Sequence, residues 1–543
     1  MAFEKEADFE AALIRQLTEK HGWEPEVLRY PTEEDLLRNW AAILFENNRS
    51  IDRLNDVPLT EGEMNQLLEQ IQKLRTPVAL NDFVNGKEVT IVRDNPDDGL
   101  HYGREVSLHL YDRMEIAAGR SRYQIAEQPV FRPKGDFYPK RRGDFTLLIN
   151  GMPLIHVELK RSGVDISRAC NQIRLYAHEG VFTGLFSLVQ IFVAMTPEKA
   201  LYFANPGPEG TFNPAFYFHW ADFNNEYIED WQCVAEHLLS IPMAHQLIGF
   251  YTVADRQDGI LKVMRSYQYY AASKIADAVH ERDWSEKRFR GGYIWHTTGS
   301  GKTMTSFKSA QLIAASRDAD KVVFLMDRIE LGTQSLREYR GFSRDDRAVA
   351  ETEDTDALAA KLKSDDPADT LIVTSIQKMS RIRAGDVYRE ADIERMRRKR
   401  IVFIIDEAHR DTFGEMLRTI RDTFPYAMFF GFTGTPIHEE NRKKGNTTTD
   451  VFGDELHRYS IADGIRDKNV LGFDPYQVLV YRDKDLRRVV ALEKARAATE
   501  EEALADPKKA EIYRHYMGND VPMAGYTKED GTIANGYTIT KAY

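Results

Sequence analysis

The chain has 543 residues, 42% of them hydrophobic and 29% charged, so it is long enough for more than one core and has an ordinary globular composition. Its net charge of −12 argues against a protein that coats nucleic acid uniformly, and no apolar run is long enough to span a bilayer. The two cysteines, Cys170 and Cys233, are too few and too far apart for a disulfide framework or zinc module, and the start is acidic where a signal peptide would be basic; both features predict a cytoplasmic protein.

Apolar spacing of three to four residues predicts a mostly helical segment over 1–75. Short strands, turns and one helix after Ser162 are expected over about 82–235, followed by a helical connector over 255–285. Five nearly continuous apolar runs then alternate with helices, as in a parallel sheet buried on both faces: GGYIW, KVVFLM, TLIVTS, RIVFIID and AMFFGFTG. We therefore expect an α/β protein with domains over 1–250 and 251–475 and an incomplete, polar segment over 476–543.

The stretch TLLINGMPLIHVELKRS, 146–162, predicts a β-hairpin that turns at Asn150-Gly151. Alternation places His156, Glu158 and Lys160 on one face of its second strand. On the hairpin alone, an edge strand with a solvated polar face is the favoured interpretation of these residues. A solvated basic loop would likewise explain the excess of seven Lys/Arg over three acids between residues 132 and 161.

Asp144 begins the partner strand, so the turn decides whether it joins this face. A two-residue turn pairs Asp144 with Val157 and points it away from Glu158, whereas a three-residue loop with a left-handed Gly151 pairs it with His156. We expect the three-residue loop, or an equivalent bulge, because only then do the two carboxylates share a face.

A phosphate-binding loop is predicted at HTTGSGKTMTS, 296–306, between a strand and a helix. Gly299, Ser300 and Gly301 allow backbone N–H groups to surround phosphate oxygens at a helix N-terminus. Lys302 is expected to reach the β- and γ-phosphates, and Thr303 to hold Mg²⁺.

The run RIVFIIDEAHR ends in Asp406 and Glu407, at the carboxyl end of a buried strand, where open α/β sheets bind ligands. Asp406 is expected to contact Mg²⁺, and Glu407 to position and deprotonate the attacking water. The structural alternative is that Asp406 and Glu407 are simply acidic residues in the first turn of a helix, where they stabilise its N-terminus.

Together, GSGKT, DEAH at 406–409 and TGTP at 433–436 resemble the first RecA-like lobe of superfamily 2 helicases and translocases. RSYQYYAA, 265–272, is similar to the adenine-recognising motif, with Gln268 as the reader and Arg265 beside it. The resemblance further implies nucleic-acid contacts or relay roles in two other motifs, at Asp327, Arg328, Thr374 and Gln377.

In the first domain, Asp144, Glu158 and Lys160, with Gln172 and Tyr176 on one helical face, resemble the PD-(D/E)xK nucleases that carry a QxxxY motif. That resemblance implies divalent metal on Asp144 and Glu158 and a lysine that orients the hydrolytic water or stabilises charge. Gly143 stands where this family usually has proline.

A nuclease followed by a translocase lobe resembles the restriction, or motor, subunit of type I restriction-modification enzymes, and INGMPLIHVELKR and FGDELHRYSIADGIRDKNVLGF match that family. The resemblance implies an endonuclease that uses ATP and Mg²⁺, cuts double-stranded DNA away from the recognition site, and works with methyltransferase and specificity subunits. Because the family assigns DNA recognition to another polypeptide, the sequence of this chain does not reveal the recognition site.

No second RecA-like lobe with its arginine finger is recognisable after Tyr476. We therefore expect a truncated subunit that binds ATP, hydrolyses it poorly and does not translocate by itself. Two alternatives stay open: a standalone defence or repair nuclease with a regulatory ATP lobe, and a non-catalytic assembly module.

Overall fold

The computed structural model divides into two compact units, Met1–Leu471 and Gly472–Tyr543. It describes residues 2–86, 88–115, 119–132, 139–287, 291–326, 354–383, 385, 388–406, 413–437, 447–470, 483–518, 526–527 and 533–534. Within these residues, no helix is long and apolar enough to cross a membrane.

The chain begins with four helices, as the apolar spacing predicts: α1 (Glu6–Lys20), α2 (Glu33–Asn47), α3 (Glu61–Lys73) and α4 (Pro77–Asn85). Capping explains where they start. The hydroxyls of Thr32 and Thr60 accept hydrogen bonds from the backbone three residues later in two capping boxes, and Thr76 caps α4 with proline at its first position. The apolar faces of these helices are buried against the sheet that follows.

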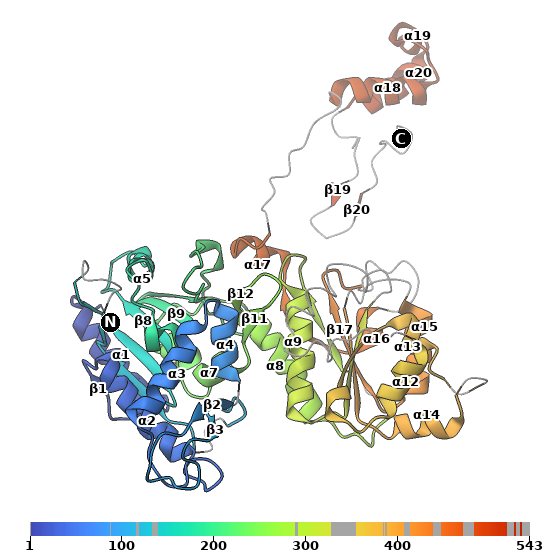
Figure 1. Ribbon diagram of the computed structural model, residues 1–543. Helices are drawn as coiled ribbons and strands as arrows, with labels where there is room; N and C mark the ends of the chain where they lie inside the picture. Colours follow the sequence, from blue (N-terminus) through green and yellow to red (C-terminus); the bar gives the residue numbers. More distant parts are fainter. Residues whose placement is uncertain are drawn as a thin grey trace. The chain divides into compact units, whose positions relative to one another are not determined.

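Sheet A, the six-stranded sheet of the first half, has the order β1-β4-β7-β8-β9-β10 (Figure 1). Its strands are β1 (Leu28–Arg29), β4 (Tyr123–Glu127), β7 (Phe145–Ile149), β8 (Met152–Leu159), β9 (Ile191–Thr196) and β10 (Lys199–Ala204). Central β8 pairs antiparallel with β7 and parallel with β9, and all its residues are buried. The edge-strand interpretation of the hairpin is therefore wrong, because both edges of β8 are hydrogen-bonded and neither face is solvated.

Shorter elements surround sheet A. They are the strand pairs β2 (Glu88–Val92) with β3 (Glu105–His109) and β5 (Val130–Phe131) with β6 (Arg141–Arg142), and the helices α5 (Ser167–His178), α6 (Trp231–His237) and α7 (Met243–Gly249). Helix α5 is the one expected after Ser162. The predicted helical connector is only partly right: it begins with a hairpin of β11 (Thr252–Asp255) and β12 (Ile260–Val263), turned by Gly259 at φ +68°, before α8 (Ser266–His280).

Sheet B, of the second half, is wholly parallel in the order β15-β14-β16-β17-β13-β18. Its strands are β13 (Gly292–His296), β14 (Lys321–Met326), β15 (Leu371–Ser375), β16 (Ile401–Ile405), β17 (Met428–Thr433) and β18 (Glu455–Tyr459). The first five are the predicted apolar runs, which confirms the α/β class. Strand β18 was not predicted, because the edge sequence ELHRY is polar and only half buried.

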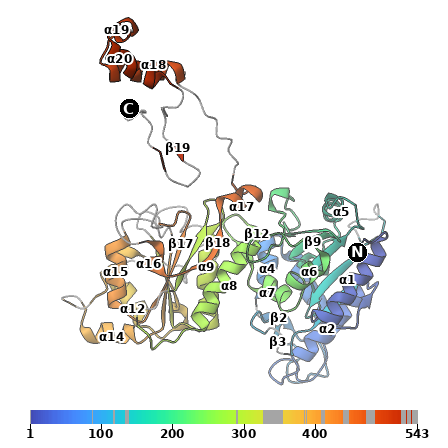
Figure 2. The ribbon, with the colours of Figure 1, turned by 180° about the vertical axis from the view of Figure 1, so that it is seen from behind.

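Helices cover both faces of sheet B. Figures 1 and 2 show α8 and α9 (Lys302–Ser316) on one side of it and the remaining helices on the other. The latter are α12 (Thr355–Lys363), α13 (Ile376–Ser380), α14 (Glu390–Arg397), α15 (Phe413–Thr423) and α16 (Thr448–Phe452), and α17 (Ile461–Arg466) follows β18. Alternate residues of β14 enter different cores: Val322 and Phe324 join the core shared with sheet A, whereas Val323 and Leu325 face α12 and α13.

The C-terminal unit contains α18 (Asp483–Ala495), α19 (Glu500–Ala505), α20 (Pro507–Met517) and the strand pair β19 (Tyr526–Thr527) with β20 (Ile533–Ala534). Its small core is built from Ala491, Ala495, Ala503 and Tyr513. Helices were not predicted there, since alanine and charged residues give this segment little apolar periodicity.

Candidate nuclease and nucleotide sites

The β7–β8 hairpin brings Asp144 and Glu158 onto one face by a bulge. Asn150 and Gly151 have φ of 51° and 81°, which makes a two-residue turn of the type that twists with the strands. The register then shifts by one residue between Leu147 and Leu148, so Phe145 lies opposite Val157 and the next pair would be Asp144 with Glu158. The three-residue loop is wrong, but the equivalent bulge is confirmed.

The three polar side chains of this face are in contact. The Asp144 carboxylate accepts a 2.5 Å hydrogen bond from the Leu159 backbone N–H, directly after Glu158. Lys160 Nζ lies 3.5 Å from Glu158 Oε1, 3.2 Å from Glu6 Oε1 and 2.5 Å from the Leu159 carbonyl oxygen, to which it donates. Of the two carboxylates expected near Lys160, Glu158 is therefore in direct contact with it.

Burial and neighbouring charges shift the pKa values of all three ionisable groups in this cluster. Desolvation, and secondly the charge of Glu158, raises the pKa of Asp144 well above its usual value. Desolvation also raises the pKa of Glu158 to about 8, although Lys160 opposes the shift. For Lys160, burial works against the charged form, but the carboxylates of Glu158, Asp144 and Glu6 outweigh it and raise the pKa.

Two adjacent buried carboxylates are a donor set suited to a divalent cation. Glu158 Oε2 is buried, lies 3.4 Å from His156 Nε2 and accepts no hydrogen bond from the described residues, so it is a candidate ligand for such an ion. Over the same part of the chain, no group of three or more His, Cys, Asp or Glu side chains is arranged as a metal site. The residues therefore fit an ion that takes two carboxylates from the protein and its other ligands from water, backbone or substrate.

The side chains of Gln172 and Tyr176 form a hydrogen-bonded chain that ends on the backbone just before Asp144. Gln172 Nε2 donates to the Tyr176 hydroxyl at 2.7 Å, and that hydroxyl donates to the Arg142 carbonyl at 2.7 Å. These two bonds tie α5 to the backbone two residues ahead of Asp144. The geometry gives the pair a positioning contact rather than one with a reacting group.

Gly143 is explained by the space around it. A Cβ at this position would lie 2.6 Å from His156 Cε1 and 2.8 Å from Phe131 Cε2, and both rings are fully buried. The Gly143 N–H also lies 3.4 Å from the Pro129 carbonyl oxygen as a weak hydrogen-bond donor. Proline, the residue usual in the PD-(D/E)xK nucleases, would clash with the rings and lose this contact.

Sequence reasoning missed the acidic residues of α1. Glu6 contacts Lys160, and Glu10 accepts a hydrogen bond from Gln128 Nε2 at 3.0 Å while its second oxygen is buried without a partner among the described residues. Burial raises the pKa of Glu10 to about 7, despite the bond from Gln128. The available signal was an acid at position 10 on the apolar helix face of Phe9 and Leu13.

The phosphate loop has the predicted form. It joins β13 to α9, and Gly299 and Gly301 adopt left-handed φ of 83° and 77° that only glycine takes without strain. Lys302 is almost fully buried at the start of α9, and its Nζ lies close to Gly434 of the TGTP segment. Thr303 follows in the first turn.

Other residues of the motifs predicted in the second half lie at the same sheet edge. Because every strand of sheet B is parallel, the phosphate loop after β13, Asp406 after β16 and the TGTP segment after β17 all lie at carboxyl ends. Thr374 is at the corresponding end of β15, and Gln377 follows in α13. Glu407, Asp327 and Arg328 lie outside the described residues.

Gln268 is held against the phosphate loop. Its amide nitrogen donates to the Ser300 and Gly301 carbonyls at 3.2 and 3.4 Å, and its oxygen accepts from the Arg265 backbone N–H at 3.0 Å. Tyr267 donates its hydroxyl proton to the Ser300 carbonyl at 2.7 Å. The predicted base reader and the phosphate loop therefore form one hydrogen-bonded unit.

Two family models match the two halves of the chain. Residues 3–211 match the type I restriction enzyme R protein N terminus, and residues 267–509 match the SWI2/SNF2 ATPase. The first match covers the carboxylates of sheet A, and the second covers the phosphate loop and all of sheet B.

Relatives agree with both matches. A type I restriction enzyme endonuclease subunit of Staphylococcus aureus, SauMSSORF170P, is 36% identical over 96% of this chain and 52% of its own length. The putative C-terminal part of the MpnIIP endonuclease subunit of Mycoplasma pneumoniae is 38% identical over 38% of this chain and 99% of its own. The EcoprrI subunit of Escherichia coli is 29% identical over 54% of this chain and 88% of its own.

This chain spans about half the length of the Staphylococcus relatives. Among solved structures, the DNA-bound Type ISP restriction-modification enzyme LlaBIII matches with a TM-score of 0.29 and 17% identity over 48% of this chain and 22% of that one, too weak a likeness to add to the argument. With both family models and near-complete coverage of the Mycoplasma relative, the chain belongs to the endonuclease subunits of type I restriction enzymes.

Proposed function

We propose that this chain cleaves double-stranded DNA in a type I restriction-modification enzyme, in company with methyltransferase and specificity subunits, and that its second half uses ATP to move DNA. Cleavage away from the recognition site belongs to the same proposal. The observation that carries it is the bulge in β8, which places Asp144 beside Glu158 and Lys160 in a chain that also has a complete phosphate loop.

In the nuclease half, Asp144 and Glu158 would hold Mg²⁺, which when bound polarises the scissile phosphate and lowers the pKa of water. Lys160, already beside Glu158, is placed to orient that water or to stabilise negative charge. Gln172 and Tyr176 fix the backbone before Asp144 and thus set the distance between the two carboxylates. Their role would be positioning.

In the motor half, residues 299–301 would surround the phosphates of ATP with backbone N–H groups, and Lys302 would neutralise their charge. Thr303 and Asp406 would hold the accompanying Mg²⁺, with Glu407 directing the attacking water. Gln268 and Arg265 border the cavity next to the loop, where they can meet the base and ribose. Thr374 and Gln377, with Asp327 and Arg328, are candidates for DNA contact.

The test is cleavage of unmodified DNA by the complete complex with ATP and Mg²⁺. We expect Lys160→Ala to abolish cleavage while ATP consumption persists, and Lys302→Ala to abolish ATP consumption. The exposed neighbour Arg161 and the α12 residue Lys361 supply matched alanine controls, which should behave as the unaltered complex.

Two other outcomes would contradict parts of this proposal. Cleavage by the lone chain without ATP or partner subunits would favour a standalone nuclease. Unchanged restriction by the Lys160→Ala complex would show that the sheet A cluster is not the cleavage site.

A further inference from the structure

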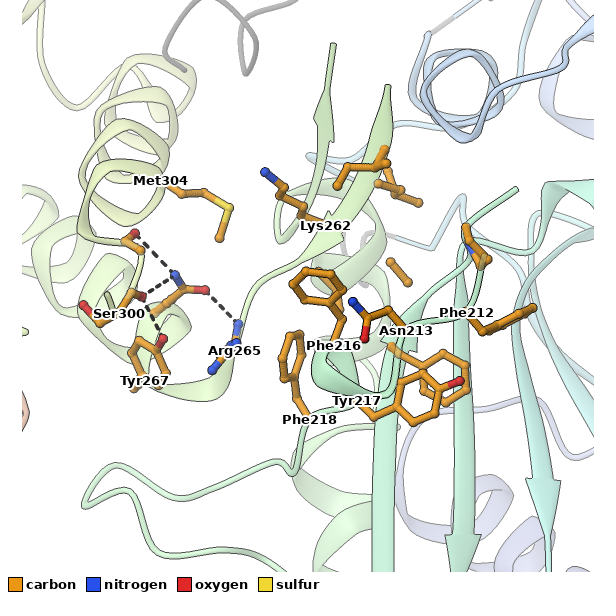
Figure 3. Close-up of a pocket in the computed structure, with 18 of the residues that line it drawn as sticks. Phe212, Asn213, Phe216, Tyr217, Phe218, Lys262, Arg265, Tyr267, Ser300 and Met304 are labelled. Carbon is orange, nitrogen blue, oxygen red and sulfur yellow. Dashed lines mark hydrogen bonds between the residues drawn. The ribbon is translucent and has the colours of Figure 1, made fainter. Parts of the chain in front are cut away.

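A cavity of about 420 Å³ lies beside the phosphate loop, and its walls come from both halves of the first unit. Ser300 and Met304 line one side, whereas Phe216 and Phe218, from the segment after β10, line the other (Figure 3). These two pairs are 82 to 88 residues apart in sequence and meet only in the folded chain.

The cavity is continuous with the place where phosphates would bind. It is lined by Gly299, Ser300 and Gly301 of the loop and by Met304, the residue after the proposed Mg²⁺ ligand Thr303. A triphosphate held by the loop must extend its remaining part, the ribose and base, away from the α9 N-terminus. This adjoining cavity has the size of small-ligand pockets and mostly apolar walls, with polar groups of Gln268 and Arg265 at one side.

The aromatic wall is rigidly connected to sheet A. Phe216 ends the short helix η2 (Pro214–Phe216), which Asn213 caps through a 3.0 Å hydrogen bond from the Ala215 N–H. Two residues later, Phe218 exchanges backbone hydrogen bonds of 2.9 and 3.0 Å with Tyr202 of β10. The wall is therefore an extension of the sheet that carries Glu158.

Phe216 is conspicuous because, among the residues that the structure describes, its ring packs against no other aromatic ring. The residue is 53% exposed, although the neighbouring Phe212 and Phe218 are more protected, and Figure 3 shows its ring directed toward the cavity. The Arg265 guanidinium lies 4.1 Å from the centroid of the Phe218 ring and thereby connects the two walls. An exposed aromatic ring at the mouth of a polar-edged cavity is typical of a surface that stacks on a planar ligand.

We infer that the segment 211–218 covers the base of the bound nucleotide, so that a nucleoside triphosphate is held jointly by the nuclease half and the motor half. This inference rests on the proposed binding of ATP and adds that the nuclease half contributes to affinity through the base. Inorganic triphosphate, which lacks the base, would occupy the phosphate loop without engaging Phe216. Nucleotide occupancy would thereby be communicated to sheet A.

The experiment measures binding of ATP and of inorganic tripolyphosphate, each with Mg²⁺, to the full chain by calorimetry. Because loss of a stacked aromatic partner weakens base binding by roughly ten-fold or more, Phe216→Ala should raise the Kd for ATP about ten-fold and change that for tripolyphosphate less than two-fold. Phe216→Trp keeps an aromatic ring at this position and should bind ATP with the affinity of the unaltered chain. Tyr102→Ala, a comparably exposed aromatic outside the cavity, is the control and should leave both constants unchanged.

Equal ATP affinity of Phe216→Ala and the unaltered chain would overturn the inference while leaving ATP binding intact. If the unaltered chain binds neither ligand, or if Lys302→Ala still binds both, the phosphate-loop assignment itself fails and the inference with it. Hydrogen exchange gives an independent readout: ATP, but not tripolyphosphate, should protect the backbone amides of 211–218, and equal protection by both ligands would contradict a contact with the base.

Discussion

Replacing Gly143 by alanine tests whether close packing behind Asp144 builds the nuclease site. The added methyl would lie 2.6 Å from His156 and 2.8 Å from Phe131, well inside contact distance. Both rings are fully buried and surrounded by further aromatic side chains, so neither can move aside without disturbing its neighbours. Overpacking of this kind costs about 1–3 kcal/mol.

The assay is urea unfolding followed by tryptophan fluorescence, which reports mainly on the first half because Trp23, Trp40, Trp220 and Trp231 are buried there. Gly99→Ala is the control, since a methyl at that position meets nothing within 4 Å. We expect Gly143→Ala to lose about 1–3 kcal/mol of unfolding free energy relative to this control and to reduce DNA cleavage, because the displaced backbone carries Asp144. Equal stability of the two variants would refute the packing argument.

Three further predictions concern single side chains. Tyr176→Phe removes the hydrogen bond to the Arg142 carbonyl and should reduce DNA cleavage several-fold with ATP consumption unchanged; unaltered cleavage would exclude a positioning role. Glu6→Gln should weaken the hold on Lys160 and lower cleavage less than Lys160→Ala does, and an equal loss would mean that Glu6 itself takes part in the chemistry. Burial lowers the pKa of His245 to about 4, although the hydrogen bond to the Asp112 carbonyl opposes the shift. The contribution of neutral His245 to the unfolding free energy should therefore be fully present above pH 6.5 and fall by about 3 kcal/mol as the pH drops toward 4. His245→Gln should flatten this pH dependence in urea unfolding measured from pH 7 to 4.5.

Local patterns predicted much of both sites. The alternation in PLIHVELK placed Glu158 and Lys160 on one face, and four-residue spacing joined Gln172 to Tyr176, because each relation depends only on the geometry of one strand or one helix. The glycines of GSGKT predicted the left-handed turns of the phosphate loop for the same reason. The five apolar runs predicted the interior of sheet B.

Relations between distant segments were decided by the tertiary structure. The sequence allowed two registers for the hairpin. In the structure, a bulge combines the two-residue turn with a shared face for the two carboxylates, and no local sequence pattern fixes the position of that bulge. Likewise, only folding brings Glu6 to Lys160 and Phe216 to the phosphate loop. A side chain's own element fixes the direction in which it points, but what it meets there depends on how the whole chain buries its apolar surface, and that is a property of the packed core rather than of any short stretch of sequence.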